Sequence, residues 1–232
     1  MKVVAVIPAR GGSRRIPHKN IIEFVGKPLI EWTIEAAIAS QLFDKIIVST
    51  DDVAIAKVAE ECGIEVPFLR QAASDDITPV SMATIEAIKQ AQNYWNDEYD
   101  VVVQLMANCP TRGSQEIVDS YNHFTQAEVN YQLSCFKFGF MNPWWAARLD
   151  ESSKPAFIFP ESLQMRSQDL PDLYCPTGAI WIARVPNLIK EKTFYGQDHI
   201  FYPIGWKEAL DIDNREDLEL AAIIFKSKLF KV

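Results

Sequence analysis

The sequence predicts an open α/β fold, in which a mostly parallel β-sheet carries helices on both faces. Two observations predict it. A short, continuously apolar run rich in β-branched residues, such as 3–7, is typical of a strand buried on both faces of a sheet, and 45–49 is the next expected strand. Amphipathic stretches of about ten or more residues alternate with these runs, and this alternation indicates βαβ units. A chain of 232 residues is typical of one domain with a sizeable core.

The elements are expected in a simple order from the N-terminus. The first strand, Val3–Ile7, ends in a Gly-rich basic loop, and an amphipathic helical stretch follows over 28–40. After the second strand, Thr50-Asp51-Asp52 offers N-caps for a helix over 53–62, with Gly63 as its stop. The later elements are a helix over 80–94 after the polar run 74–76, a strand over 100–105, a helix over 116–125, a strand over 179–183 and a final helix over 215–230.

The alternation of strands and helices breaks between about residues 138 and 176. This stretch carries Trp144-Trp145, several prolines and few helical signals. Two adjacent exposed tryptophans are unfavourable on a monomer. We therefore expect one domain, 1–232, with an inserted hairpin or arm over 138–176 that packs on another subunit. The alternative is a loop folded over its own core.

Composition and charge exclude several classes of protein. With 48% hydrophobic and 23% charged residues, the chain is an ordinary globular protein. Its 23 basic and 31 acidic residues give a net charge of −8, which argues against a nucleic-acid partner. Four cysteines without metal-ligand spacing indicate free thiols in a reducing compartment. No apolar run is long enough for a membrane span or a signal peptide. We expect a cytoplasmic protein without a membrane partner.

The most informative stretch is the loop over residues 8–20. It leaves the carboxyl end of the first strand, where open α/β sheets bind ligands. Gly11 and Gly12 would let backbone amides approach an anion closely. Neither a GxxxxGK[ST] loop nor a GxGxxG motif is present, which disfavours P-loop kinases and dinucleotide dehydrogenases. The loop also carries a cluster of four cations, and this cluster favours a polyphosphate site: Arg10, Arg14, Arg15 and Lys19. The alternative is a basic loop that is simply solvated.

A second candidate site is the acidic pair Asp211 and Asp213. Residues 209–213 alternate between apolar and polar as a strand would, so the two carboxylates are expected on the same side. Two converging carboxylates suit Mg²⁺, with waters and phosphate oxygens completing its coordination. Asp213-Asn214 also suits a cap for the final helix, and both roles can hold at once.

The loop Ile7–Asn20 resembles the signature of the CMP-sialic acid synthetases, or acylneuraminate cytidylyltransferases. Similar blocks follow in the family's order at 43–51, 67–70, 176–181 and 211–218. The resemblance implies a Rossmann-like sheet of the nucleotidyltransferase type. It also implies an enzyme that uses CTP and Mg²⁺ to activate a nine-carbon 2-keto sugar acid, releasing pyrophosphate and forming the CMP-sugar. The resemblance further implies a homodimer.

The resemblance also implies roles for individual residues. Arg10, Lys19 and Asp211 are expected to carry catalysis, with Asp211 and Asp213 holding the metal. Arg70 is expected beside the cytosine or its ribose, and a surface salt bridge is its alternative role. The remaining nucleotide-binding positions lie in the basic loop: Gly11, Gly12, Ser13, Arg14 and Asn20. The expected sugar-binding positions are Asn108, Arg166, Gln168 and Thr177, with Arg166 for the sugar carboxylate.

The sequence departs from the family pattern on the sugar side. Cys175 and Thr177 replace an arginine and an asparagine, and residues 106–112 replace Gln-Pro-Thr-Ser-Pro-Leu-Arg. The sugar is therefore expected to be of the sialic, legionaminic or pseudaminic type, with the first two slightly ahead.

Three rival functions stand beside this expectation. A 3-deoxy-manno-octulosonate cytidylyltransferase is disfavoured, because its loop resembles Pro-Gly-Lys-Pro where residues 17–20 of this chain are Pro-His-Lys-Asn. A different sugar nucleotidyltransferase would accept a sugar that carries a phosphate. A nucleotide-binding assembly module would bind CTP without catalysis, and the presence of both the loop cations and the aspartate pair disfavours it.

Overall fold

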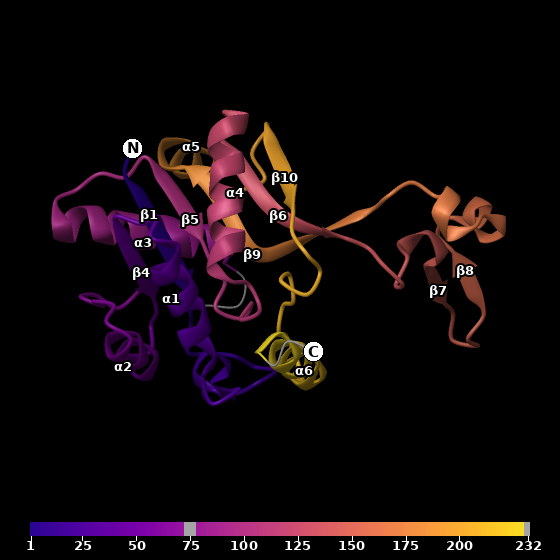
Figure 1. Ribbon diagram of the computed structural model, residues 1–232, viewed down its shortest axis with the longest axis horizontal. Helices are drawn as coiled ribbons and strands as arrows, with labels where there is room; N and C mark the ends of the chain where they lie inside the picture. Colours follow the sequence, from indigo (N-terminus) through magenta and orange to yellow (C-terminus); the bar gives the residue numbers. More distant parts are fainter. Residues whose placement is uncertain (72–77, 230–232) are drawn as a thin grey trace.

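A six-stranded sheet with the order β10-β6-β9-β5-β1-β4 forms the centre of the molecule (Figure 1). The computed structural model describes residues 1–71 and 78–229. β9 runs antiparallel to β5 and β6, and the other neighbours pair in parallel. The expected open, mostly parallel sheet is thus confirmed. Its strands are β1 (Val3–Pro8), β4 (Lys45–Ser49), β5 (Val101–Gln104), β6 (Tyr131–Lys137), β9 (Tyr174–Arg184) and β10 (His199–Pro203).

Helices cover both faces of this sheet (Figure 1). Successive side chains of β1 point to opposite faces of the sheet: Ala5 and Ile7 belong to one apolar core, and Val4 and Val6 belong to the other. All four are fully buried, as expected of a strand covered on both faces. No helix in the described ranges is long and apolar enough to cross a membrane. One face carries α1 (Leu29–Ser40), α2 (Val53–Glu61) and α4 (Ser114–Ala127), and the other carries α3 (Val80–Trp95) and α5 (Val185–Glu191).

The local signals for α2 behave as expected. Asp52 caps the helix, since its Oδ1 accepts from the Ala54 amide at 2.8 Å. Gly63 follows the helix with a φ of 84°, in the left-handed region that favours glycine. The cap expected over residues 74–76 lies outside the described residues.

The strand expected over residues 209–213 is wrong. This segment is a loop without a strand partner among the described residues. Other segments bind its backbone groups instead: Thr177 Oγ1 donates to the Ala209 carbonyl at 2.9 Å, and the Ile212 amide donates to the Asn108 carbonyl at 2.9 Å. The sequence pattern also gave no expectation of β6, β10 or α5. In β6 the buried polar residues Gln132 and Ser134 interrupt the apolar run.

The residues between β6 and β9 form an arm that projects from the end of the sheet (Figure 1). Its centre is a hairpin of β7 (Ala147–Leu149) and β8 (Pro155–Phe157), with 3₁₀ helices at Pro143–Trp145, Pro160–Gln164 and Ser167–Asp169. β9 begins at Tyr174, so the last residues of the expected arm belong to the sheet.

The two adjacent tryptophans pack within the arm. The Trp144 ring lies 4.9 Å from that of Phe159, and its Nε1 donates to the Pro171 carbonyl at 2.8 Å. Trp145 is 40% exposed. The expectation of two exposed tryptophans is therefore only partly correct, because Trp144 helps to form a small core of the arm itself.

The C-terminal helix α6 (Arg215–Leu229) closes the body beside a short hairpin of β2 (Glu23–Phe24) and β3 (Lys27–Pro28), which follows a 3₁₀ turn at Lys19–Ile21. The Phe225 ring lies 4.3 Å from Trp32 and 5.6 Å from Phe24, measured between centroids. Because α6 follows directly on residues 211–213, this aromatic contact also holds the acidic pair in place.

Phe225→Ala is expected to destabilise the protein by about 2–3 kcal/mol, because it removes a partly buried ring from the contact with Trp32 and Phe24. The measurement is the free energy of unfolding in denaturant. Ile223→Ala on the same helix is the control, since Ile223 is 67% exposed and should change stability by less than about 0.5 kcal/mol. Equal effects of the two substitutions would show that the aromatic contact does not anchor α6.

Candidate active site

The carboxyl ends of the parallel strands β1, β4 and β5 meet at one edge of the sheet, where α/β proteins bind ligands. A cavity of about 310 Å³ opens there. β9 enters the same edge from the opposite direction, since Trp181 pairs with Gln104 at the end of β5. We call this the nucleotide cavity, and its lining is Pro8, Arg10, Arg15, Lys19, Asn20, Arg70, Thr78, Val80, Ala83, Met106, Asn108, Asp211 and Asp213.

The basic loop and the acidic pair lie against one another in the wall of this cavity. Lys19 Nζ donates to the Ile212 carbonyl at 2.7 Å and lies 3.3 Å from Asp213 Oδ1. Arg15 Nη2 lies 2.9 Å from Asp213 Oδ2. A neighbouring hollow of about 340 Å³ is lined by the same loop, with Ser13 and Arg14 added to Arg10, Arg15, Lys19 and Asn20. The structure thus brings the loop cations and the carboxylates to one place.

Asn20 and Gly11 shape the basic loop rather than offering free donors to a ligand. Asn20 is 8% exposed, and its Nδ2 donates to the Arg10 carbonyl at 2.9 Å. The Gly11 amide donates to Asp51 Oδ1 at 2.9 Å, so it is not available to an anion as expected. A Cβ on Gly11 would lie 2.8 Å from the Asp52 Cβ, which leaves no room for a side chain. Gly12 has open space around its Cα.

Asn108 clamps the acidic segment to the loop after β5. Its Nδ2 donates to Asp211 Oδ1 in a short hydrogen bond and to the Ile212 carbonyl at 3.2 Å. Asn108 lines the nucleotide cavity, but its amide donor is committed to Asp211 and Ile212 and not directed at a sugar. Burial, and then repulsion by Asp213, raises the pKa of Asp211 to about 6.

The donor set fits Mg²⁺. That ion is usually held by one or two carboxylates together with waters and substrate phosphates, and two carboxylates line this cavity. A divalent cation would relieve the repulsion between Asp211 and Asp213. Asn108 Oδ1 is buried and has no hydrogen-bond partner among the described residues, so it adds a neutral oxygen on the same side chain that holds Asp211. No cluster of three acidic, His or Cys ligands occurs within the described ranges.

Arg70 is a buried residue of the cavity, so its alternative role in a surface salt bridge is wrong. It is 5% exposed, and its Nη1 donates to the Ser49 carbonyl and the Ser49 Oγ at 3.4 Å each. Its own amide donates to the Thr50 carbonyl at 2.7 Å. Burial lowers the pKa of the guanidinium. The strand end at β4 therefore presents a fixed cation to the cavity.

The four expected sugar-binding residues separate into two groups. Asn108 lines the nucleotide cavity, whereas Thr177 does not line it, is 6% exposed and has its hydroxyl bonded to the Ala209 carbonyl. Arg166 and Gln168 lie in the arm, which projects away from this edge of the sheet (Figure 1). Arg166 forms a fork with Asp169 through Nε at 2.7 Å and Nη2 at 3.1 Å. The structure does not bring Arg166 and Gln168 to the cavity of their own chain.

The sequence of residues 4–137 matches the family model of the cytidylyltransferases. The chain belongs to this family. It is 35% identical over 97% of both chains to a pseudaminic acid cytidylyltransferase of Campylobacter jejuni. It is 33% identical to a CMP-N,N'-diacetyllegionaminic acid synthase of Legionella pneumophila, over 95% of this chain and 94% of the relative. An N-acylneuraminate cytidylyltransferase of Escherichia coli is 32% identical over 98% of this chain and 53% of its own length.

By their names, these three relatives act on pseudaminic acid, form CMP-N,N'-diacetyllegionaminic acid and act on N-acylneuraminate, respectively. Solved structures show the same fold at lower identity. A CMP:2-keto-3-deoxy-manno-octonic acid synthetase complexed with CTP superimposes with a TM-score of 0.73 at 15% identity, over 98% of this chain and all of the other. A cytidylyltransferase of Leptospira borgpetersenii gives a TM-score of 0.60 at 19% identity, over 100% and 94%. Both have the architecture of this cytidylyltransferase.

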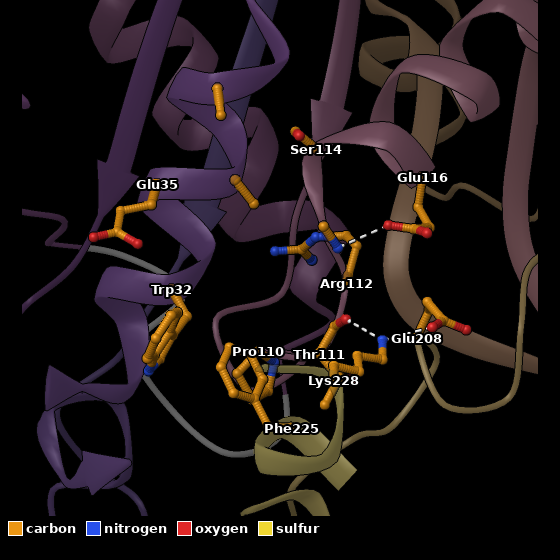
Figure 2. Close-up of a pocket in the computed structure, with 13 residues that line it drawn as sticks. Trp32, Glu35, Pro110, Thr111, Arg112, Ser114, Glu116, Glu208, Phe225 and Lys228 are labelled. Carbon is orange, nitrogen blue, oxygen red and sulfur yellow. Dashed lines mark hydrogen bonds and ion pairs between the residues drawn. The ribbon is translucent and has the colours of Figure 1, made fainter. Parts of the chain in front are cut away.

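A larger cavity of about 730 Å³ lies elsewhere in the cytidylyltransferase, between α1, α4 and α6 (Figure 2). Figure 2 shows Lys228 between Glu208 and Thr111, at 2.5 Å from Glu208 Oε1 and 3.1 Å from the Thr111 carbonyl. Arg112 is buried and donates to the Ala179 carbonyl at 2.6 Å. Lys228 thus connects α6 to the loops after β5 and β10, and Arg112 connects the loop after β5 to β9. The cavity shares no lining residue with the nucleotide cavity.

Sequence reasoning missed three features of the cytidylyltransferase site. Asp51 was expected only as a helix cap, yet it holds the Gly11 amide. Arg15 was counted as a cation, and its pairing with Asp213 was not foreseen. Asn108 was expected to touch the sugar, and it clamps Asp211. The position of Asp51 directly after a parallel strand was the available signal, because such positions face the ligand edge.

Gly11→Ala is expected to raise KM for CTP at least tenfold, because its Cβ displaces the basic loop from Asp52. Asp52→Gly removes the obstructing side chain and, as an N-cap change to glycine, should cost only a few tenths of a kcal/mol. The double variant should therefore recover most of the CTP affinity lost in Gly11→Ala. A double variant as weak as Gly11→Ala alone would show that the close approach to Asp52 is not the cause.

Proposed function

We propose that this cytidylyltransferase is Mg²⁺-dependent and that its nucleotide cavity holds the triphosphate of CTP between the basic loop and the acidic pair. The anomeric hydroxyl oxygen of the sugar acid forms a bond to the α-phosphorus, and the bond between the α-phosphorus and the pyrophosphate oxygen breaks. The observation that carries this proposal is that Lys19 and Asp213 line the same cavity and form an ion pair there at 3.3 Å.

Positioning and charge neutralisation are the main tasks of the protein in such transfers. Arg10 and Lys19 are proposed to bind the phosphates, with Ser13, Arg14 and Arg15 on the neighbouring hollow. Arg70, fixed at the end of β4, is proposed to contact the cytosine or its ribose. Asp211 and Asp213 would hold Mg²⁺, which when bound neutralises phosphate charge and assists the departure of pyrophosphate.

Asp211 is proposed to act by holding the metal, and the proton of the sugar hydroxyl is proposed to leave to water at the cavity. Asn108 holds the Asp211 carboxylate in place by donating to its Oδ1.

The sugar carboxylate requires a cation. Arg166 on the arm of a second subunit is the cation that we propose for this role. Arg166 lies on the arm, which projects away from the sheet (Figure 1), and does not line the nucleotide cavity of its own chain. The arm and its base expose large apolar side chains, with Phe140 85%, Met141 72% and Leu149 68% exposed. We therefore propose a homodimer in which each arm carries Arg166 and Gln168 to the cavity of the partner.

The free cysteines are consistent with a reducing cytoplasm, which is the proposed location.

Purified protein with CTP and Mg²⁺ is expected to release pyrophosphate with at least one of N-acetylneuraminic, legionaminic and pseudaminic acid. Lys19→Ala and Asp213→Ala should each lower kcat at least a hundredfold while the unfolding midpoint stays within a few degrees. Chelation of Mg²⁺ should abolish release. Turnover of only the eight-carbon octulosonic acid, or of only a sugar 1-phosphate, would assign the protein to one of those two classes of nucleotidyltransferase instead. CTP binding in calorimetry without any turnover would favour an assembly module.

Mixing two inactive variants tests the arm. Arg166→Ala retains an intact cavity, and Lys19→Ala retains an intact arm, so a mixed dimer has one complete site. Random reassociation should restore about a quarter of the wild-type activity. Lys19→Ala mixed with Asp213→Ala is the matched control, because both lesions lie in the body and no mixed dimer has a complete site. Equal activity in the two mixtures would show that Arg166 does not act across the subunits.

A further inference from the structure

The cavity of about 730 Å³ between α1, α4 and α6 has no part in the proposed function (Figure 2). Its volume is in the range of pockets that enclose one small molecule. We propose that this cavity, here called the helix cavity, binds a small organic carboxylate whose charged group pairs with Arg112. The site is separate from the proposed catalysis, because the helix cavity and the nucleotide cavity share no lining residue.

Arg112 is a buried cation with one unused edge. It is 1% exposed, and its Nη1 donates to the carbonyls of Ala179 at 2.6 Å and Met106 at 3.4 Å. Its Nε and Nη2 have no hydrogen-bond partner among the described residues. These two nitrogens form the edge of a guanidinium that binds the two oxygens of a carboxylate through parallel hydrogen bonds. Burial lowers the pKa of the group to about 10, so it stays charged at neutral pH.

Other donors gather at the same place. Figure 2 shows the Arg112 guanidinium in the space between the start of α4 and α1. Thr111 also lines the helix cavity and is 4% exposed, and its Oγ1 has no partner in the part of the chain that the structure describes. The N-cap of α4 is Gly113, which has no side chain to accept from the amides of the first turn. An acceptor-only group such as a carboxylate fits this set of donors.

The acidic side chains on the wall are already engaged, which leaves room for one further negative charge. Glu208 lies 2.5 Å from Lys228, and Glu35 forms an ion pair with Lys27. Glu116 Oε2 accepts from a backbone amide at the start of α4 at 2.9 Å. A phosphate dianion would be repelled by these carboxylates about twice as strongly as a monoanion. The charges therefore favour a carboxylate over a phosphate.

The body of the ligand is expected to be apolar. Much of the remaining wall is formed by apolar side chains, namely Trp32, Ala36, Ala39, Pro110 and Phe225. An apolar body buried against them gains about 25 cal/mol for each Å² removed from water. Benzoate, which joins one carboxylate to one flat apolar ring, is therefore a suitable probe of the helix cavity.

The test measures binding of benzoate to the full chain by calorimetry, with acetate and inorganic phosphate for comparison. Benzoate should bind at one site with a Kd of about 1 mM or tighter. Acetate lacks the apolar ring and phosphate carries more charge, so each should bind at least about fivefold more weakly. Saturating CTP with Mg²⁺ should leave the benzoate affinity unchanged, because CTP is proposed to occupy the other cavity.

Ala39→Glu tests the position of the site, since Ala39 is exposed and lines the helix cavity. The added carboxylate should weaken benzoate binding about tenfold or more. Ile38→Glu is the matched control, because it adds the same charge at the next residue, which is 45% exposed and outside the cavity. It should leave binding unchanged. Arg112→Lys keeps the charge without the two-donor edge and should abolish binding; if this buried variant does not fold, the Ala39 and Ile38 pair decides.

Absence of benzoate binding to the wild type would overturn the inference and would indicate that water satisfies the free edge of Arg112. Tighter binding of inorganic phosphate than of benzoate would overturn the assignment to carboxylates. Competition by CTP, or equal effects of Ala39→Glu and Ile38→Glu, would place the bound benzoate outside the helix cavity and overturn the inference as well. Each of these outcomes leaves pyrophosphate release from CTP, and with it the proposed function, intact.

Discussion

The contact of Lys19 with residues 212 and 213 is the interaction on which the site depends. It joins positions 193 residues apart and brings a cationic loop against an acidic segment. Ile212 is fully buried beneath this contact, and its carbonyl accepts from both Lys19 and Asn108. Three segments of the chain therefore meet at one peptide group. The spacing between the cations of the basic loop and the acidic pair is set there.

The charges around Asp213 differ in how firmly they are held. The Lys19 side chain is 15% exposed, whereas the Arg15 side chain that pairs with the same carboxylate is 64% exposed. An exposed pair of that kind contributes only about 0–1 kcal/mol. A polyphosphate can therefore draw Arg15 away at little cost, while Lys19 remains bound to the backbone of residue 212. This difference explains how a chain of net charge −8 can present an anion site.

The strands of the central sheet could be predicted from the sequence where both faces of a strand are covered by helices. β1 and β5 are apolar at nearly every position because helices cover both of their faces, and β4 has an apolar centre, so this pattern can be seen in the sequence itself. β6 was not predictable in the same way. Its buried Gln132 is satisfied by Ser120 of α4, at 2.7 Å to the carbonyl and 3.0 Å to the hydroxyl. A hydrogen-bond partner so far from Gln132 in the sequence leaves no local pattern that predicts the strand. The loop over 209–213 also finds its hydrogen-bond partners in distant segments, so its conformation could not be predicted locally.

The sequence by itself determined the residue types of the site, namely a basic loop after a buried strand and an aspartate pair near the last helix. It also determined the family, because similar blocks occur in the same order along the chain. The tertiary structure decided what each group does. Gly11 donates to Asp51, Asn108 clamps Asp211, and Arg70 is enclosed at the end of β4. It also separated Arg166 from the nucleotide cavity and placed a second, mostly apolar cavity of about 410 Å³ beside Asp211. Chemical identity is local to a residue, whereas hydrogen-bond partners and cavities arise only when distant segments pack together.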